Sequence, residues 1–238
     1  MLKLIPFASS SKGNLYLLQN EETNILIECG VNEKDIRKYL KSVGLMITDL
    51  NGCILTHTHS DHSLSVDYVS DYIDTYVPLE LYQKCDNTLK IEPKIPFKIG
   101  TIKVLPIPIE HGKCENNAFV FMDKDGCVFF ATDFSLMEQN VSNFKFKRIY
   151  IECNYSDDEL DYILKMEDNL DDKRGKHIRQ VSTHMSKENC KEHLRKMDLS
   201  QCEEIVLLHP SAFLISKEQT KKEFEQEFKI KTIFAKEK

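Results

Sequence analysis

ILTHTHSDHS, residues 54–63, places three histidines and one aspartate within six positions, directly after a short apolar run. The four side chains are His57, His59, Asp61 and His62. Packing gives no reason for such a density of imidazoles, whereas zinc is bound by histidine nitrogens and carboxylate oxygens. His57 and His59 lie two positions apart, so in an extended segment they point to the same side. The stretch therefore predicts metal binding, and it requires partners elsewhere in the chain.

Candidate partners stand at the ends of three later apolar runs. His111 ends PIPIEH, Asp133 ends VFFATD and His209 ends IVLLH. The ends of strands in an α/β sheet can meet in space although they are far apart in sequence. Two ions roughly 3.5–4 Å apart, with a bridging carboxylate, would use all of these ligands and leave a position open for water. We therefore expect a two-metal site.

Composition limits the class of protein. A chain of 238 residues, 41% hydrophobic and 29% charged, is typical of a soluble globular protein, and we expect one domain over residues 1–238. No apolar run is long enough to span a membrane. The eight cysteines form no C-x-x-C pair, which indicates free thiols and a cytoplasmic location.

Strand and helix patterns alternate in two rounds, each with loops that carry histidine or aspartate. The first round has predicted strands at 14–19, 24–28, 52–57 and 75–82 and predicted helices at about 33–43 and 65–73. The second has strands on either side of Gly100, a hairpin about 124–126, strands at 148–153, 204–211 and 230–235, and helices at 156–170, 183–198 and after Ser216. This alternation predicts a layered α/β fold with two sheets face to face and helices outside.

The segment HTHSDH resembles the H-x-H-x-D-H signature of the metallo-β-lactamase superfamily. The order of NILIECG, IEHG, ATDFS and LLHPS fits that family over nearly the whole chain. The resemblance implies an αββα four-layer sandwich of two mixed sheets with outer helices, and a one- or two-zinc site between its halves. By this resemblance one Zn²⁺ would be held by His57, His59 and His111, the other by Asp61, His62 and His209, with Asp133 bridging the two and Mn²⁺ as the alternative metal.

Residues 182–214 resemble the C-terminal block of the phosphodiesterase branch of this superfamily, which includes ribonuclease Z and the WalJ-type exonucleases. His184 occupies the place of a histidine that opens a helix in those enzymes. The resemblance implies that His184 contacts the scissile phosphate and protonates the leaving oxygen. Asp61 would both bind metal and orient a dizinc-bound hydroxide for attack on phosphorus. Glu28 departs from the family, in which an aspartate is commoner at that place.

We therefore expect a zinc-dependent phosphodiesterase acting on nucleic acids or nucleotides. The net charge of −6 and the 21 residues between His111 and Asp133, too few for a tRNA-holding arm, favour a small substrate. That alternative is a cyclic mononucleotide phosphodiesterase that degrades signalling nucleotides, as in phages and bacteria. Another alternative is a thioester or lactone hydrolase, which needs the zinc site but not His184; a third is a non-enzymatic binding module. By resemblance, a homodimer is expected.

Overall fold

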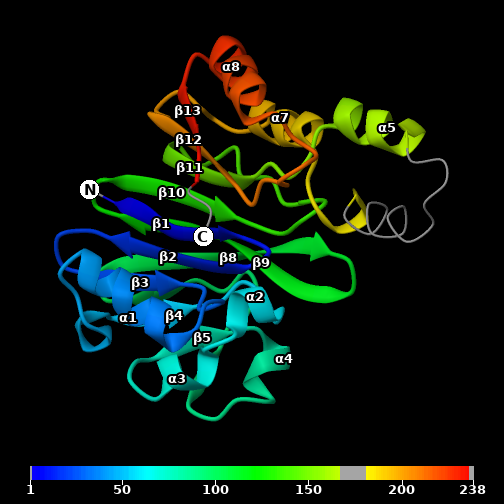
Figure 1. Cartoon of the computed structure of the whole chain (residues 1–238). Coiled ribbons are helices and arrows are strands. Elements are labelled where there is room, and N and C mark those ends of the chain that lie inside the picture. The colour runs from blue at the N-terminus through cyan, green and yellow to red at the C-terminus, as the bar shows by residue number, and fades with distance from the viewer. Residues whose placement is uncertain (1, 167–180, 236–238) are drawn as a thin grey trace.

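Two mixed β-sheets lie face to face in the computed structural model, which describes residues 2–166 and 181–235 (Figure 1). The first sheet has the strand order β1-β2-β3-β4-β5-β6. Its strands are β1 (Lys3–Ser10), β2 (Gly13–Gln19), β3 (Asn24–Ile27), β4 (Gly52–Ile54), β5 (Thr75–Val77) and β6 (Thr88–Lys90). Strands β1 to β3 pair antiparallel as a meander, and β3 to β6 pair parallel.

The second sheet has the order β13-β12-β11-β10-β9-β8-β7. Its strands are β7 (Phe97–Ile99), β8 (Ile102–His111), β9 (Cys114–Asp123), β10 (Gly126–Ala131), β11 (Phe146–Glu152), β12 (Glu204–Leu208) and β13 (Lys231–Phe234). Strands β7 to β10 pair antiparallel and β10 to β13 pair parallel. Each sheet thus contains an antiparallel part made of hairpins and a parallel part. The carboxyl ends of the parallel strands lie at the same edge of the sheet.

Helices cover the outer face of each sheet (Figure 1). They are α1 (Glu33–Ser42), the 3₁₀ turn η1 (Ile47–Asp49), α2 (Ser60–Ser63), α3 (Val66–Ser70), α4 (Leu79–Tyr82), α5 (Asp157–Met166), α7 (Lys187–Arg195) and α8 (Lys217–Phe228). Helices α1 to α4 belong to the half built on the first sheet, and α5, α7 and α8 belong to the other half. The helix expected at 156–170 is observed to Met166, and its last residues lie outside the described part of the chain.

Three apolar cores separate the four layers. Between the sheets, Tyr16, Leu18, Phe121, Phe130 and Tyr150 pack in one buried cluster. The alternate residues of the same strands point outward, to helix α1 in the first half and to helices α7 and α8 in the second. Both faces of each sheet are therefore buried, which explains why the strands read as nearly continuous apolar runs rather than as alternating patterns. The αββα sandwich expected from the sequence is confirmed.

One expected strand ends early. The strand expected at 75–82 stops at Val77, and Pro78 is the N-cap of the short helix α4. Proline has no N–H to donate to a neighbouring strand, and its fixed φ suits the start of a helix. The expectation of a strand through Tyr82 was therefore wrong.

One expected helix begins late. The helix expected from residue 183 starts at Lys187, where the Ser186 side chain accepts a hydrogen bond from the Asn189 backbone N–H at 3.2 Å. His184 therefore lies in the connection that precedes α7 and does not open the helix. This connection leads the chain across the strand ends of the second sheet, which is where the candidate site lies.

Candidate metal centre

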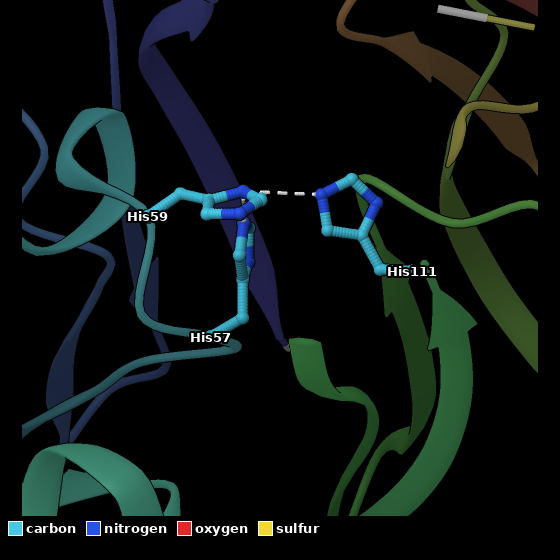
Figure 2. Close-up of side chains that lie close together, drawn as sticks. All are labelled: His57, His59 and His111. Carbon is cyan, nitrogen blue, oxygen red and sulfur yellow. Dashed lines mark hydrogen bonds between the residues drawn. The ribbon is translucent and has the colours of Figure 1, made fainter. Parts of the chain in front are cut away.

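Three imidazoles converge where the first sheet meets the β8–β9 hairpin (Figure 2). Nδ1 of His59 lies 3.1 Å from Nε2 of His57 and 3.1 Å from Nε2 of His111. All three ligand atoms lie within 4.8 Å of one another, close enough to share one ion. His57 and His59 both precede α2, with His59 as its N-cap, and His111 is the last residue of β8. The structure thus brings together the three residues expected to hold the first ion.

The surroundings of these histidines favour the ligand form of imidazole. Nδ1 of His111 donates to the backbone carbonyl of Thr183 at 2.8 Å. Because a carbonyl only accepts, the proton is fixed on Nδ1 and Nε2 presents its lone pair. Burial lowers the pKa of His111, and burial together with the charge of His62 lowers the pKa of His57 well below its usual value. Neutral imidazole is the form that binds metal.

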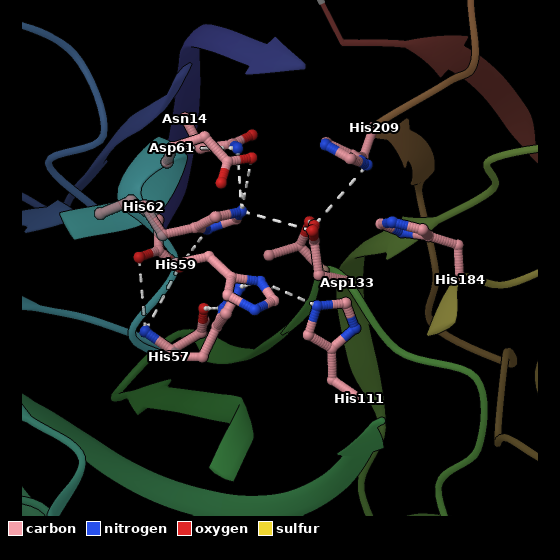
Figure 3. A network of polar contacts seen from close by, with 12 residues as sticks. Asn14, His57, His59, Asp61, His62, His111, Asp133, His184 and His209 are labelled. Carbon is pink, nitrogen blue, oxygen red and sulfur yellow. Dashed lines mark hydrogen bonds and ion pairs between the residues drawn. The ribbon is translucent and has the colours of Figure 1, made fainter. Parts of the chain in front are cut away.

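A second group of possible ligands combines imidazole with carboxylate (Figure 3). It consists of Asp61, His62, Asp133 and His209. Nε2 of His62 lies 3.6 Å from Oδ2 of Asp61 and 3.4 Å from Oδ2 of Asp133, and Nδ1 of His209 lies 3.7 Å from Oδ1 of Asp133. Asp133 belongs to this second group, and its charge also acts on His57 and His111 of the first group. The bridging role of Asp133 stays a prediction.

Backbone strain accompanies the site. Among the described residues, six non-glycine residues have positive φ, and three of them follow strands that end at the site: Glu28 (62°), Asp133 (54°) and His209 (50°). The left-handed region is costly for residues with a side chain and persists where the surrounding structure enforces it. In each case the residue lies just beyond the end of its strand, among the candidate ligands and the groups that contact them.

Two buried carboxylates stand behind the histidines, and both are completely buried. Oε1 of Glu28 lies 3.4 Å from Nδ1 of His62. Oε1 of Glu152 lies 2.6 Å from Nδ1 of His184, and Oε2 accepts hydrogen bonds from the Phe134 and Met185 N–H groups at 2.8 and 3.2 Å. Buried carboxylates in such positions orient imidazoles and set their tautomers.

Glu152 was not among the residues expected in the site. It ends the apolar run RIYIE of β11 as His111, Asp133 and His209 end theirs, so the strand-end pattern could have identified it. Glu28 was noted only as a departure from the family pattern. Its role depends on contacts with a loop about thirty residues further along the chain, for which the sequence carries no signal.

His184 lies against both groups of ligands. Its ring stacks on His209 at 5.1 Å with an interplanar angle of 20°, and it meets His111 edge-on at 5.4 Å. Burial lowers the pKa of His184, but the charge and hydrogen bond of Glu152 outweigh burial and raise the pKa to about 9. The imidazolium is therefore the form held at neutral pH. Its side chain is 16% exposed, so solvent reaches it.

The donor set fits divalent cations. Histidine nitrogens with carboxylate oxygens are the ligands that zinc takes in hydrolytic sites, and Mn²⁺ accepts a similar set. The Nε2 atom of His209 is buried and has no hydrogen-bond partner among the described residues. A buried polar atom without a partner is costly, and a bound cation would satisfy it. Two surface hollows of the described chain, which share residues 139–141 in their linings, contain no candidate ligand.

Comparisons with known proteins agree with this fold. Residues 11–121 match the family model of the metallo-beta-lactamase superfamily. The chain is 24% identical over 139 residues to exodeoxyribonuclease YycJ of Bacillus anthracis and 27% identical over 139 residues to exodeoxyribonuclease WalJ of Streptococcus pneumoniae. Each alignment covers 53% of this chain and 52% of the relative, so the chain spans about half the length of the curated relatives it matches.

A solved structure matches over nearly the whole chain. The metallo-beta-lactamase fold protein YhfI from Bacillus subtilis superposes with a TM-score of 0.76 at 17% identity, covering 99% of this chain and 97% of that one. The resemblance to the metallo-β-lactamase superfamily, and to the WalJ-type exonucleases in particular, is confirmed. In the described part of the chain no helix is both long and apolar enough to cross a bilayer. The single domain, the homodimer and the cytoplasmic location stay predictions.

Proposed function

We propose that this chain, which has the metallo-β-lactamase fold, is a metal-dependent phosphodiesterase that acts on nucleic acids or nucleotides. The observation that carries the proposal is the Glu152–His184 pair beside the two ligand groups. The thiolate expelled from a thioester leaves without a general acid, whereas the alkoxide expelled from a phosphodiester must be protonated. The two exodeoxyribonuclease relatives support the same class of substrate.

Two Zn²⁺ ions are the proposed cofactors, with Mn²⁺ as the alternative. The ligands would be His57, His59 and His111 for one ion, Asp61, His62 and His209 for the other, and Asp133 for both. When bound, such a pair of ions supplies stabilisation of phosphoryl charge and acidifies water. The remaining chemistry belongs to the protein's own side chains.

His184 is the proposed general acid. Glu152 holds its Nδ1 at 2.6 Å, which leaves Nε2 as the proton donor to the departing oxygen. With a pKa of about 9, His184 carries this proton at neutral pH. The backbone N–H groups of Phe134 and Met185 fix Glu152, so the acid is already oriented before substrate binds.

Asp61 is the proposed second catalytic side chain. Its side chain is 23% exposed, in contrast to the almost completely buried Asp133 and His62. A carboxylate that faces both the ligand group and solvent can accept a hydrogen bond from the attacking water and orient it toward phosphorus. The same carboxylate would serve as a metal ligand.

A substrate panel tests the proposal. The Zn²⁺- and Mn²⁺-loaded proteins are incubated with single-stranded DNA, RNA, and 2′,3′- and 3′,5′-cyclic nucleotides, with His57→Ala as the blank. We expect hydrolysis of at least one class above the blank, and the class identifies a polymer or a cyclic mononucleotide as the substrate. Hydrolysis of a lactone or thioester alone would contradict the proposal.

The role of His184 is tested by the leaving group. His184→Ala should lower kcat for an ordinary nucleotide ester about 10²–10⁴-fold, because the alkoxide then leaves without a proton. The loss should be much smaller for a p-nitrophenyl ester, whose leaving group needs no acid, and bound metal should be unchanged by elemental analysis. Equal losses on both esters would instead assign His184 a structural role.

A further inference from the structure

Three exposed apolar side chains follow candidate ligands closely in the chain. Leu64, Leu136 and Phe213 follow His62, Asp133 and His209 within four residues, and they are 60%, 43% and 83% exposed. Single exposed apolar residues are common on proteins, so the one whose backbone is tied to a candidate ligand is the informative one. Phe213 is the most exposed of the large apolar side chains in the described chain.

The loop that carries Phe213 is fixed at both ends. The Ser211 backbone N–H donates to the Asn154 carbonyl at 2.8 Å, and the Ser156 N–H donates to the Leu214 carbonyl at 2.8 Å. Leu214 is only 1% exposed and packs in a small apolar cluster with residues at the start of α5. The Phe213 ring is therefore directed to solvent by an anchored backbone, while its neighbour in the chain is buried.

The same contacts tie this loop to the candidate ligands. Nδ2 of Asn154 donates to the His209 carbonyl at 2.7 Å, and the His209 N–H donates to Oγ of Ser9 at 3.0 Å. Asn154 thus holds both the ligand histidine and the Phe213 loop. The loop that carries Phe213 is therefore joined, through Asn154, to a candidate ligand of the second group.

We propose that Phe213 is the platform on which a nucleobase of the substrate stacks, next to the scissile phosphate. The inference rests on the proposed phosphodiesterase function and narrows it to substrates that carry a base. A phenylalanine side chain has only two rotatable bonds to order on binding, and every nucleobase offers a π-face to it. Replacing such a platform by alanine is expected to weaken recognition about 5- to 150-fold.

Two esters with the same leaving group test this inference. Thymidine 5′-(p-nitrophenyl phosphate) carries a base and methyl p-nitrophenyl phosphate does not. Phe213→Ala should lower the ratio of their kcat/KM values about 5- to 150-fold, and Phe213→Tyr should keep most of it. Tyr72→Ala, an exposed aromatic in the first half, should leave the ratio unchanged. An unchanged ratio in Phe213→Ala would overturn the inference while leaving the phosphodiesterase proposal intact.

A binding measurement makes the test independent of turnover. The chain contains no tryptophan, so Phe213→Trp introduces a single indole whose emission reports on the platform. Thymidine 5′-monophosphate should quench this emission in the metal-loaded protein, and inorganic phosphate should not. Quenching without hydrolysis of either ester would support the platform and contradict the phosphodiesterase proposal. Equal emission with and without the nucleotide would overturn the platform.

Contact with a second copy of the chain is the alternative explanation for the exposed Phe213 ring. Sedimentation of the wild type and of Phe213→Ala separates the two. The platform predicts that the oligomeric state is the same in both proteins. Dissociation of Phe213→Ala to a smaller species, with unchanged preference between the esters, would place the ring in an interface between copies and overturn the inference.

Discussion

The two groups of candidate ligands are assembled differently. The first group is three imidazoles without a carboxylate, two of them from one loop. The second is two histidines with two carboxylates, and Glu28 and Glu152 stand behind it. Asp133 and His209 of the second group have left-handed backbone, and no member of the first group does. Two of the three residues of the first group thus come from one local motif. The second group depends on buried carboxylates and left-handed backbone that the whole fold maintains.

Asp133→Asn tests whether the two groups share a carboxylate, and it should have the largest effect. Asparagine keeps the size of the side chain and tolerates positive φ, so the fold should survive. We expect loss of metal from both groups and a fall in activity larger than the roughly 10–100-fold that an outer contact contributes. Elemental analysis and hydrolysis rates measure both. Two ions retained per chain would show that Asp133 bridges nothing; Asp71→Asn, an exposed aspartate after α3, is the control.

Glu28→Gln and Glu152→Gln form a matched pair that separates binding from proton transfer. Glu28 contacts His62, so its variant should weaken metal affinity at the second group about 10–100-fold. Glu152 raises the pKa of His184 to about 9, and a raised pKa means that the protonated form is lost only as pH rises through that value. In Glu152→Gln the alkaline limb of the kcat–pH profile should therefore move to lower pH. If both variants changed metal affinity and the kcat–pH profile in the same way, Glu28 and Glu152 would not have separate roles in binding and proton transfer.

Gly30→Ala tests how closely the segment after β3 packs against the turn that carries Asp61 and His62. A Cβ atom at Gly30 would lie 1.6 Å from the Asp61 carbonyl oxygen and 2.6 Å from the His62 backbone nitrogen. Because both atoms belong to backbone, the α2 turn must shift, at a cost of about 1–3 kcal/mol in the free energy of unfolding. Urea unfolding measures the loss. At Gly44 the added Cβ would have no atom within 4 Å, but φ is 79°. Gly44→Ala therefore reports the cost of a positive φ without a steric clash.

Glu223→Gln should have the smallest effect, because it acts on α7 from outside the site. Partial burial raises the pKa of Glu223, but hydrogen bonds from Lys191 and Gln219 outweigh it and lower the pKa to about 2. Because this pKa is lowered, the ion pair stabilises the folded protein above pH 4.5, by about 1 kcal/mol in the free energy of unfolding for such a surface pair. This stabilisation is lost as pH falls toward 2. Unfolding of the wild type and the variant at pH 7 and pH 3 measures this difference. An equal difference in the free energy of unfolding between the two proteins at pH 7 and pH 3 would contradict the lowered pKa of Glu223.

Much of the fold could be predicted because its local signals are strong. Helix α1 has the asparagine cap and apolar spacing expected of it, and the hairpin of β9 and β10 turns at Lys124 and Asp125 as expected. The start of the helix that follows His184 could not be placed, since Thr183 and Ser186 are both acceptable N-caps in sequence. The hydrogen bond of Ser186 to Asn189 decides between them, and it forms only in the folded chain.

The sequence by itself determined the loop of histidines and the strand ends that carry His111, Asp133 and His209. It could do so because ligand chemistry and strand length are local properties of the chain. Tertiary structure alone decided that Glu28 and Glu152 stand behind the histidines and that Phe213 faces solvent while Leu214 is buried. Burial, pKa and exposure depend on neighbours brought from distant segments, because a residue's surroundings are set by how the layers pack.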